Sequence, residues 1–168
     1  MKNLKKYTYE DDLLGNITLI FSNETGLIEE IIVSSNNDSN QIAIDRYGNL
    51  EEEKPERFLK KLQDYLKGNL FKFSLDDLNM DKFSDFHKSV LIEEFNSEYG
   101  STNSYSELAS KINNPKASRA VGTALGKNPY PIVIPCHRTL KRDGSIGNYT
   151  GGVEIKKKLL DLEKNNKK

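Results

Sequence analysis

Two short helices are predicted by the stretch SYSELASKINNPKASRAVGTAL, residues 104–125. Ser104 is a suitable N-cap, and Glu107 three positions later completes a capping box. The first helix then runs to Ile112, with its apolar side chains on the inward face. A turn of two asparagines follows, so the chain is expected to reverse within a few residues.

The second helix of this stretch is predicted to begin near Pro115 and to continue over 118–125. Pro115 lies close to its start and suits the first helical position, where a missing N–H does no harm. Two short helices across a tight turn make a helix-turn-helix candidate. A plain αα-hairpin has the same spacing and remains an alternative.

Downstream, the apolar run 132–135 leads to the only cysteine of the chain, Cys136, followed by His137 and Arg138. A thiol is nucleophilic only as thiolate, and a neighbouring base or cation favours that form. Adjacent residues of an extended strand point to opposite sides, so His137 could meet Cys136 only on a turn or through a water. Glu163 is a candidate to orient the imidazole, and a buried structural cysteine is the alternative interpretation.

The end of the chain contains a loop with glycines at 144, 147, 151 and 152, followed by an amphipathic helix over 154–163. Residues 164–168 are polar and are expected to fray. A further helix is predicted over 85–95, before the opening stretch.

The first half of the chain shows strands followed by a helix. Residues 15–22 and 27–33 are β-branched and apolar, and the turn residues between them predict a hairpin. A third strand is predicted over 41–45. Residues 55–66 form a helix that ends near Gly68 and carries one apolar face, made of Phe58, Leu59, Leu62, Tyr65 and Leu66.

The net charge changes sign near the middle of the chain, where the predicted strands and helix of the first half give way to the helices of the second half. Residues 1–84 carry 11 Lys and Arg against 16 Asp and Glu, a net charge of −5, and residues 85–168 carry 14 against 9, a net charge of +5. A basic half is compatible with a polyanionic partner. We therefore expect an α/β domain over 1–82 and a mainly helical domain over 83–168.

Several classes of protein are not expected from this sequence. No apolar run approaches membrane-spanning length, and the basic N-terminus is followed by acidic residues, not by a signal-peptide core. A single cysteine excludes an internal disulfide and suggests a reducing, cytoplasmic setting. The two histidines and one cysteine lack metal-ligand spacing, so no zinc site and no cofactor are expected.

The run 134–138, Ile-Pro-Cys-His-Arg, resembles the active-site motif of the O6-alkylguanine-DNA alkyltransferases. The surrounding segments 104–109, 114–122, 128–132 and 147–152 resemble other segments of that family in the same order. The resemblance covers residues 83–163. The first half matches more loosely and is similar to the family's variable N-terminal domain, an RNase H-like α/β unit with a small antiparallel sheet. Thr139 and Thr150 depart from the family's usual Val and Ser.

The resemblance implies a role for each catalytic residue. Cys136 would accept the alkyl group, His137 would act as general base through a water, and Glu163 would orient His137. Tyr105 would donate a proton to N3 of the departing guanine. The thioether that forms has no hydrolysable bond, so each molecule would act once.

The resemblance also implies how damaged DNA would be held. Arg119 would insert into a duplex where the nucleotide has flipped out. The small side chains of the second helix would let its backbone approach the minor groove. Expected DNA contacts are Lys116, Ala117, Ser118, Arg119 and Gly122, and expected pocket residues are Asn128, Pro131, Tyr149, Thr150 and Gly151.

The resemblance therefore implies a monomeric DNA repair protein that transfers a methyl or small alkyl group from guanine O6, with thymine O4 as a second substrate. Two alternatives stay open. An alkyltransferase-like protein would bind lesions without reacting, although such proteins replace the cysteine. An unrelated Cys-His hydrolase would use the thiol but would not require Tyr105 or Arg119.

Overall fold

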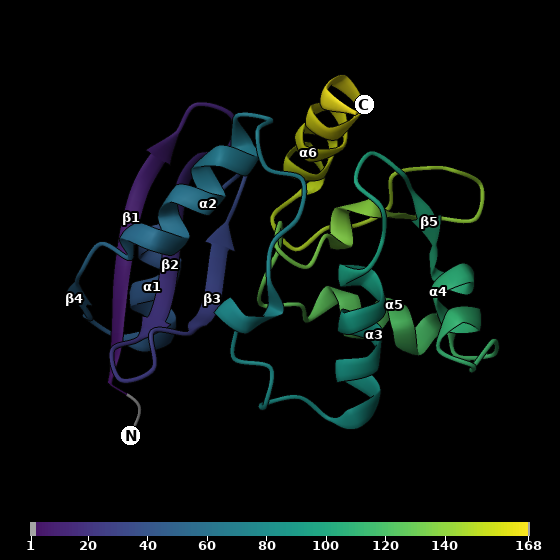
Figure 1. The fold of residues 1–168 in the computed structure, drawn as a ribbon, viewed down its shortest axis with the longest axis horizontal. Helices are drawn as coiled ribbons and strands as arrows, with labels where there is room; N and C mark the ends of the chain where they lie inside the picture. Colours follow the sequence, from purple (N-terminus) through teal and green to yellow (C-terminus); the bar gives the residue numbers. More distant parts are fainter. Residues whose placement is uncertain (1–2, 168) are drawn as a thin grey trace.

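The computed structural model describes residues 3–167, and its first half is a four-stranded sheet between two helices (Figure 1). The strand order is β3-β2-β1-β4. The strands are β1 Leu4–Asp11, β2 Gly15–Ser22, β3 Ile28–Val33 and β4 Glu51–Glu52.

The predicted hairpin of β2 and β3 is confirmed, with antiparallel pairing from Ile17–Val33 to Phe21–Ile28. Strand β1 was not predicted, because its lysines and acidic residues hide the alternation of a strand. It pairs antiparallel with β2 over its full length. The expectation of a purely antiparallel sheet is wrong, since β4 adds a short parallel pair to β1.

The predicted strand over 41–45 is also wrong, because these residues lie in helix α1, Ser39–Tyr47. Asp38 caps this helix by accepting a hydrogen bond from the Asn40 amide at 2.8 Å. Only one side of α1 meets the sheet: Ala43 is buried against Ile20 and Ile32. With so narrow an apolar face, the helical period is not visible in the sequence.

Helix α2, Glu56–Leu66, covers the other face of the sheet. The predicted face is confirmed, since all five of its apolar side chains are buried. The helix ends at Leu66, and Gly68 follows its cap residue Lys67 with a φ of +83° and an amide that donates to Tyr65 O at 2.9 Å. After a single 3-10 turn, Leu75–Asp77, the chain passes to the second half.

The second half consists mainly of helices α3 Asp85–Phe95, α4 Tyr105–Lys111, α5 Ser118–Gly126 and α6 Val153–Asn166. Ser104 caps α4 as predicted, accepting from the Glu107 amide at 3.2 Å. Two boundaries differ from the expectation. Helix α5 begins at Ser118, so Pro115 lies in the preceding turn, and α6 continues to Asn166, where fraying was expected.

The larger of two hydrophobic clusters in the described part of the chain contains residues of both halves and joins them. Their backbones also meet directly, through the Ile31 amide on Pro129 O at 2.8 Å and the Ser35 amide on Gly151 O at 2.9 Å. No helix within residues 3–167 has the length and apolarity required to cross a bilayer.

Candidate active site

The chain bends at Cys136, which begins a 3-10 turn, Cys136–Arg138. The chain turns here and is not an extended strand, so the side chains of Cys136 and His137 are not forced to opposite sides. The side chain of Asn128 supports the segment that leads into the turn: its Nδ2 donates to Ile134 O at 2.9 Å, and its Oδ1 accepts from the Tyr130 amide at 2.9 Å. The thiol is free and only 6% of Cys136 is exposed.

His137 is fully buried and lies 2.7 Å from Glu163 on α6, measured from Nε2 to Oε2. Burial alone would raise the pKa of Glu163, but the hydrogen bonds and charges of His137 and Arg138 lower it well below its usual value. Glu163 is therefore ionised and can only accept, so Nε2 of His137 carries the proton. Nδ1 is left as the basic nitrogen, and it has no hydrogen-bond partner among the described residues.

The pKa of His137 is lowered by burial, against the opposing pull of Glu163. The imidazole is thus neutral at neutral pH and able to accept a proton at Nδ1. His137 and Glu163, 26 residues apart in the sequence, form the base and its orienting carboxylate.

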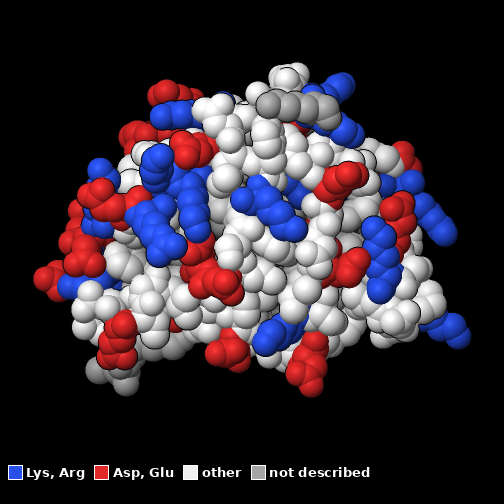
Figure 2. All heavy atoms as spheres, in the orientation of Figure 1, with Lys and Arg blue, Asp and Glu red and all other residues white. Residues whose placement is uncertain are grey.

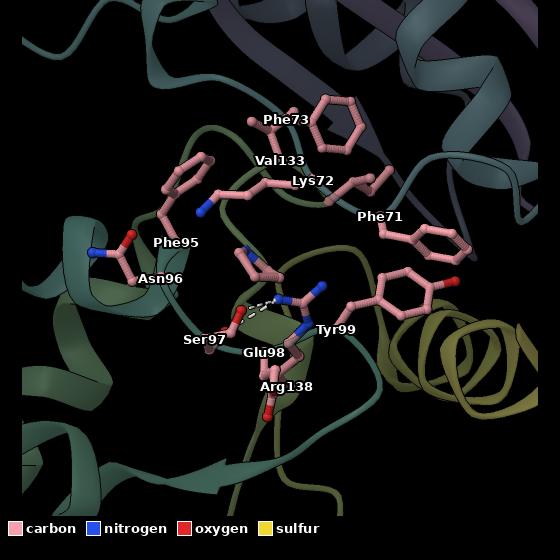
Figure 3. Close-up of a pocket in the computed structure, with 12 residues that line it drawn as sticks. Phe71, Lys72, Phe73, Phe95, Asn96, Ser97, Glu98, Tyr99, Val133 and Arg138 are labelled. Carbon is pink, nitrogen blue, oxygen red and sulfur yellow. Dashed lines mark hydrogen bonds between the residues drawn. The ribbon is translucent and has the colours of Figure 1, made fainter. Parts of the chain in front are cut away.

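Arg138 does not serve the thiol, contrary to the expectation that it could supply a nearby cation. Its Nε donates to Glu163 Oε1 at 2.8 Å and its NH2 to Oε2 at 3.0 Å. Its NH1 donates to Ser97 O at 2.6 Å. Figure 3 shows the guanidinium directed into a pocket of about 200 Å³, between Ser97 and Tyr99. Arg138 therefore fixes Glu163 from the side away from the thiol.

The cation near the thiol is Lys156 of α6, which the sequence did not single out. It is 1% exposed, and its Nζ donates to Thr139 O at 2.7 Å and to Asn148 O at 3.3 Å. Burial raises the pKa of Cys136 to about 12, whereas a hydrogen bond from Asn128 and the charge of Lys156 act in the opposite direction. The resting cysteine is therefore a thiol and needs a base to become reactive.

The thiol lies at a cavity of about 740 Å³, which we call the Cys136 cavity. Its volume is within the range of small-molecule sites. The cavity is lined by Tyr105, Ser118, Arg119, Gly122, Thr123, Leu125, Gly126, Cys136, Lys141, Asn148, Tyr149 and Thr150. Gly122 lies against the Tyr105 ring, and a Cβ on it would meet that ring at 3.6 Å, an ordinary van der Waals contact.

The structure thus brings six expected residues to one cavity: Tyr105, Ser118, Arg119, Gly122, Tyr149 and Thr150, together with Cys136. Lys116 and Ala117 line a neighbouring hollow that they share with Arg119. Pro131 and Asn128 are buried behind the cavity. Gly151 turns away to the first half, where a Cβ would lie 2.7 Å from Val33 Cγ2.

Burial raises the pKa of both tyrosines of the cavity, Tyr105 and Tyr149, and a thiolate at Cys136 raises it further. Both phenols therefore keep their protons at neutral pH and are available as donors. A buried nucleophile, a base beside it and two phenol donors around one cavity suit transfer of a group from a flat, polar substrate to sulfur.

Glu94 on α3 is another residue that the sequence did not single out. It is fully buried, and it accepts hydrogen bonds from Thr139 Oγ1 and, at 3.2 Å, from Asn103 Nδ2. Thr139 and Asn103 are paired residues of the short parallel ladder between β5 Asn103–Ser104 and β6 Thr139–Leu140. Glu94 therefore joins the segment that follows Cys136 to the start of α4, where Tyr105 lies.

The model of the 6-O-methylguanine DNA methyltransferase DNA-binding domain matches residues 85–165 of this chain. Among curated proteins, a methylated-DNA–protein-cysteine methyltransferase of Methanosarcina barkeri is 43% identical over 108 residues, covering 64% of this chain and 66% of its own length. One of Methanothermobacter thermautotrophicus is 36% identical over 124 residues, covering 71% and 68%.

The matched segments of such relatives span between 37% and 68% of their own length. The structural likeness is more extensive. The crystal structure of Mycobacterium tuberculosis OGT in complex with DNA superposes with a TM-score of 0.80 at 29% identity, covering 96% of this chain and 94% of that one.

Proposed function

The chain belongs to the methylated-DNA–protein-cysteine methyltransferase family, and from this premise we propose that it repairs DNA by moving an alkyl group from guanine O6 to Cys136. The observation that carries the proposal is the position of the thiol, which lines the Cys136 cavity and directly precedes the neutral base His137 in one 3-10 turn. Methyl and other small alkyl groups are the groups proposed to be transferred, and O4-alkylthymine is proposed as a second donor in the same reaction.

In the proposed reaction, Nδ1 of His137 takes the thiol proton through an intervening water. The Cys136 sulfur then attacks the alkyl carbon in line with the C–O6 bond, so that an S–C bond forms as the C–O bond breaks. The electron pair stays on the guanine, and the Tyr105 phenol donates a proton to N3 of that base. Tyr105 recovers a proton from solvent. The thioether is stable, so each molecule acts once.

The proposed partner is double-stranded DNA in which the damaged nucleotide is flipped into the Cys136 cavity. We assign α4 and α5 as a helix-turn-helix, with the small side chains of α5 close to the minor groove. Arg119 is exposed at the rim of the cavity and is proposed to fill the gap in the duplex. Lys116, Ala117, Ser118 and Gly122 are the remaining proposed contacts.

We further propose that residues 83–168 form the reactive domain and that residues 1–82 form an RNase H-like supporting domain. Within the pocket, Asn128 braces the Cys136 turn, Tyr149 lines the base, and the Thr150 backbone faces the alkylated oxygen, with Pro131 and Gly151 shaping the surrounding loops. A monomer in the reducing cytoplasm is the proposed working form.

The test is an intact-mass measurement after incubation with duplex DNA that contains O6-methylguanine. We expect a gain of one methyl per chain and no gain in Cys136→Ser. Repeated turnover would indicate a hydrolytic enzyme, and binding without a mass gain would indicate a lesion-binding protein; either result overturns the proposal.

The role of Arg119 has a separate test. Arg119→Ala should slow transfer from duplex DNA by about 10-fold or more, because the unfilled gap loses a few kcal/mol of stacking. The reaction with free O6-benzylguanine needs no flipped nucleotide and should be nearly unchanged. An equal loss on both substrates would contradict the assignment.

A further inference from the structure

The first half of the chain supplies one side chain to the buried base. Tyr65 of α2 is 1% exposed, and its hydroxyl donates to Glu163 Oε2 from 98 residues away in the sequence. The same hydroxyl lies 3.4 Å from His137 Nε2. Since Nε2 already carries a proton, the hydroxyl donates its proton to the carboxylate and not to the imidazole.

Packing holds the Tyr65 ring in this orientation. Its centroid lies 5.5 Å from that of Phe73 and 6.1 Å from that of Tyr99, which it meets edge-on. The ring of Tyr99 also faces the Arg138 guanidinium, 5.7 Å from its centroid. Figure 3 shows Phe73, Tyr99 and Arg138 around the pocket behind the site. The hydroxyl of Tyr65 therefore has little freedom to choose another acceptor.

Glu163 is shared by several donors. Its Oε1 accepts from Arg138 Nε at 2.8 Å and from the Gly100 amide at 3.0 Å. Its Oε2 accepts from His137 at 2.7 Å, from Arg138 NH2 at 3.0 Å and from Tyr65. Of these donors, Tyr65 alone comes from the first half. It competes with His137 for the same oxygen.

We propose that Tyr65 is a positioning residue of the proton relay, whose hydroxyl shares Glu163 Oε2 with His137 and thereby sets how strongly the carboxylate holds the imidazole. The inference rests on the proposed function, because it concerns the base that activates Cys136. It assigns the first half of the chain a direct part in the chemistry.

Loss of the hydroxyl has a consequence of definite sign. A carboxylate oxygen with one donor fewer is a stronger acceptor, so it stabilises protonated His137 more and raises the pKa of His137. The charged and titratable groups that face this pair are Arg138 of the turn, Lys156 of α6, Tyr99 after α3, Tyr149 of the glycine loop and Tyr65 itself. Replacing Tyr65 with Phe leaves all of the other groups unchanged.

Tyr65→Phe keeps the ring and removes only the hydroxyl. The rate constant of methyl transfer from O6-methylguanine duplex should be measured against pH in both proteins. The base must be neutral to act, so the acid limb of the variant should move to higher pH, by about one unit. A role in packing alone would lower the plateau and leave the limb in place, and that result would overturn the inference.

Tyr130→Phe is the matched control. Tyr130 is also fully buried, and its hydroxyl donates to Asn79 O at 2.6 Å, away from Glu163. This variant also loses one buried hydrogen bond of a tyrosine hydroxyl, and it should keep the acid limb of the parent protein. If the acid limb of Tyr130→Phe moved as far as that of Tyr65→Phe, the shift of the limb would be a general consequence of destabilisation.

A second readout does not require activity. The chain has two histidines, so 15N-histidine labelling resolves the Nε2–H proton of His137. In Tyr65→Phe its bond to Glu163 should tighten and the resonance should move downfield, with no change in Tyr130→Phe. If wild-type protein accepts no methyl, the proposed function fails while this resonance still tests Tyr65.

An unmoved resonance would refute the role of Tyr65 even if methyl transfer is observed. If Tyr65→Phe does not fold, a ring-fluorinated tyrosine inserted at position 65 retains the hydroxyl and makes it a stronger donor. The resonance of His137 should then move upfield, and a downfield shift or none would count against the inference.

Discussion

At the scale of single residues, the site depends on three groups: burial sets the ionisation of Cys136 and His137, whereas hydrogen bonds and the charges of His137 and Arg138 keep Glu163 ionised. Cys136 is a resting thiol, His137 a neutral base, and Glu163 a carboxylate that stays ionised. The three states are mutually consistent, because the only proton acceptor left in the cluster is Nδ1 of His137. Chemistry at Cys136 therefore begins with a proton transfer, not with a preformed thiolate.

This arrangement predicts the pH dependence of the wild-type protein. Burial holds the pKa of His137 below its ordinary value of 6.5, and only the neutral form can accept the thiol proton. The rate of methyl transfer should therefore be flat near neutral pH and fall only as the pH drops below 6.5. His87→Gln, which removes the other histidine, should leave this limb where it is. A midpoint above 6.5 would contradict the assignment.

Lys156 is expected to support the thiolate once the proton has left. Lys156→Met keeps the length of the buried side chain but removes its charge and its bonds to Thr139 O and Asn148 O. We expect a transfer rate about 10-fold lower, corresponding to roughly one pKa unit on Cys136. Lys157→Met, at the exposed neighbouring position, is the control. An unchanged rate in Lys156→Met would show that the charge plays no part.

At the scale of elements, the parallel ladder of β5 and β6 places Tyr105 opposite the Cys136 turn. Glu94→Ala should leave Thr139 Oγ1 and Asn103 Nδ2 without their shared acceptor, which costs about 1–3 kcal/mol of unfolding free energy. Urea unfolding measures this loss. Glu93→Ala, at the adjacent, partly exposed position, should stay within about 0.5 kcal/mol of wild type. Equal stability of the two variants would mean that Glu94 does not hold the ladder.

The elements also show where sequence reasoning succeeds. Helices α2 and α3 were predicted closely, because each has apolar residues at the helical period and a terminal signal such as Gly68. Helix α1 and strand β1 were missed. The first buries little more than Ala43, and the second is covered with charge, so their backbone structure is set by the sheet that they join.

Of the residues of the candidate site, some can likewise be predicted from the sequence and others cannot. Cys136 and His137 are adjacent in the sequence, and Tyr105, Arg119, Tyr149 and Thr150 lie in segments that resemble a known family. The sequence does not reveal the part that Lys156, Glu94 and Tyr65 play in the site, because it depends on contacts with residues far along the chain. The wrong expectation for Arg138 has the same origin, since proximity in sequence to Cys136 says nothing about its distant partner Glu163.

At the scale of the whole molecule, the opposite charges of the two halves do not form a single-sign field on every face. Figure 2 shows acidic and basic side chains interspersed on the face turned to the viewer. The basic residues that concern the proposed DNA face line the hollows around α4 and α5: Lys116, Arg119, Lys127, Lys141 and Arg142. Attraction to phosphate should therefore be local to these helices.

A salt titration tests this localisation. Arg142→Ala should reduce the slope of log affinity against log salt for undamaged duplex DNA by about 0.9, the value for one lost phosphate contact. Lys60→Ala changes an exposed position of α2 in the acidic half and should leave the slope unchanged. A slope that fell equally in both variants would show that overall charge, and not the α4–α5 surface, governs binding.

The contact between the glycine loop and the first half bears on how this protein can evolve. The glycine loop meets the first half where the Ser35 amide bonds to Gly151 O, and a Cβ on Gly152 would lie 2.1 Å from Ser35 Oγ. Selection on the first half should therefore concentrate on a few sites, such as Val33, Ser35 and Tyr65, while the rest drifts.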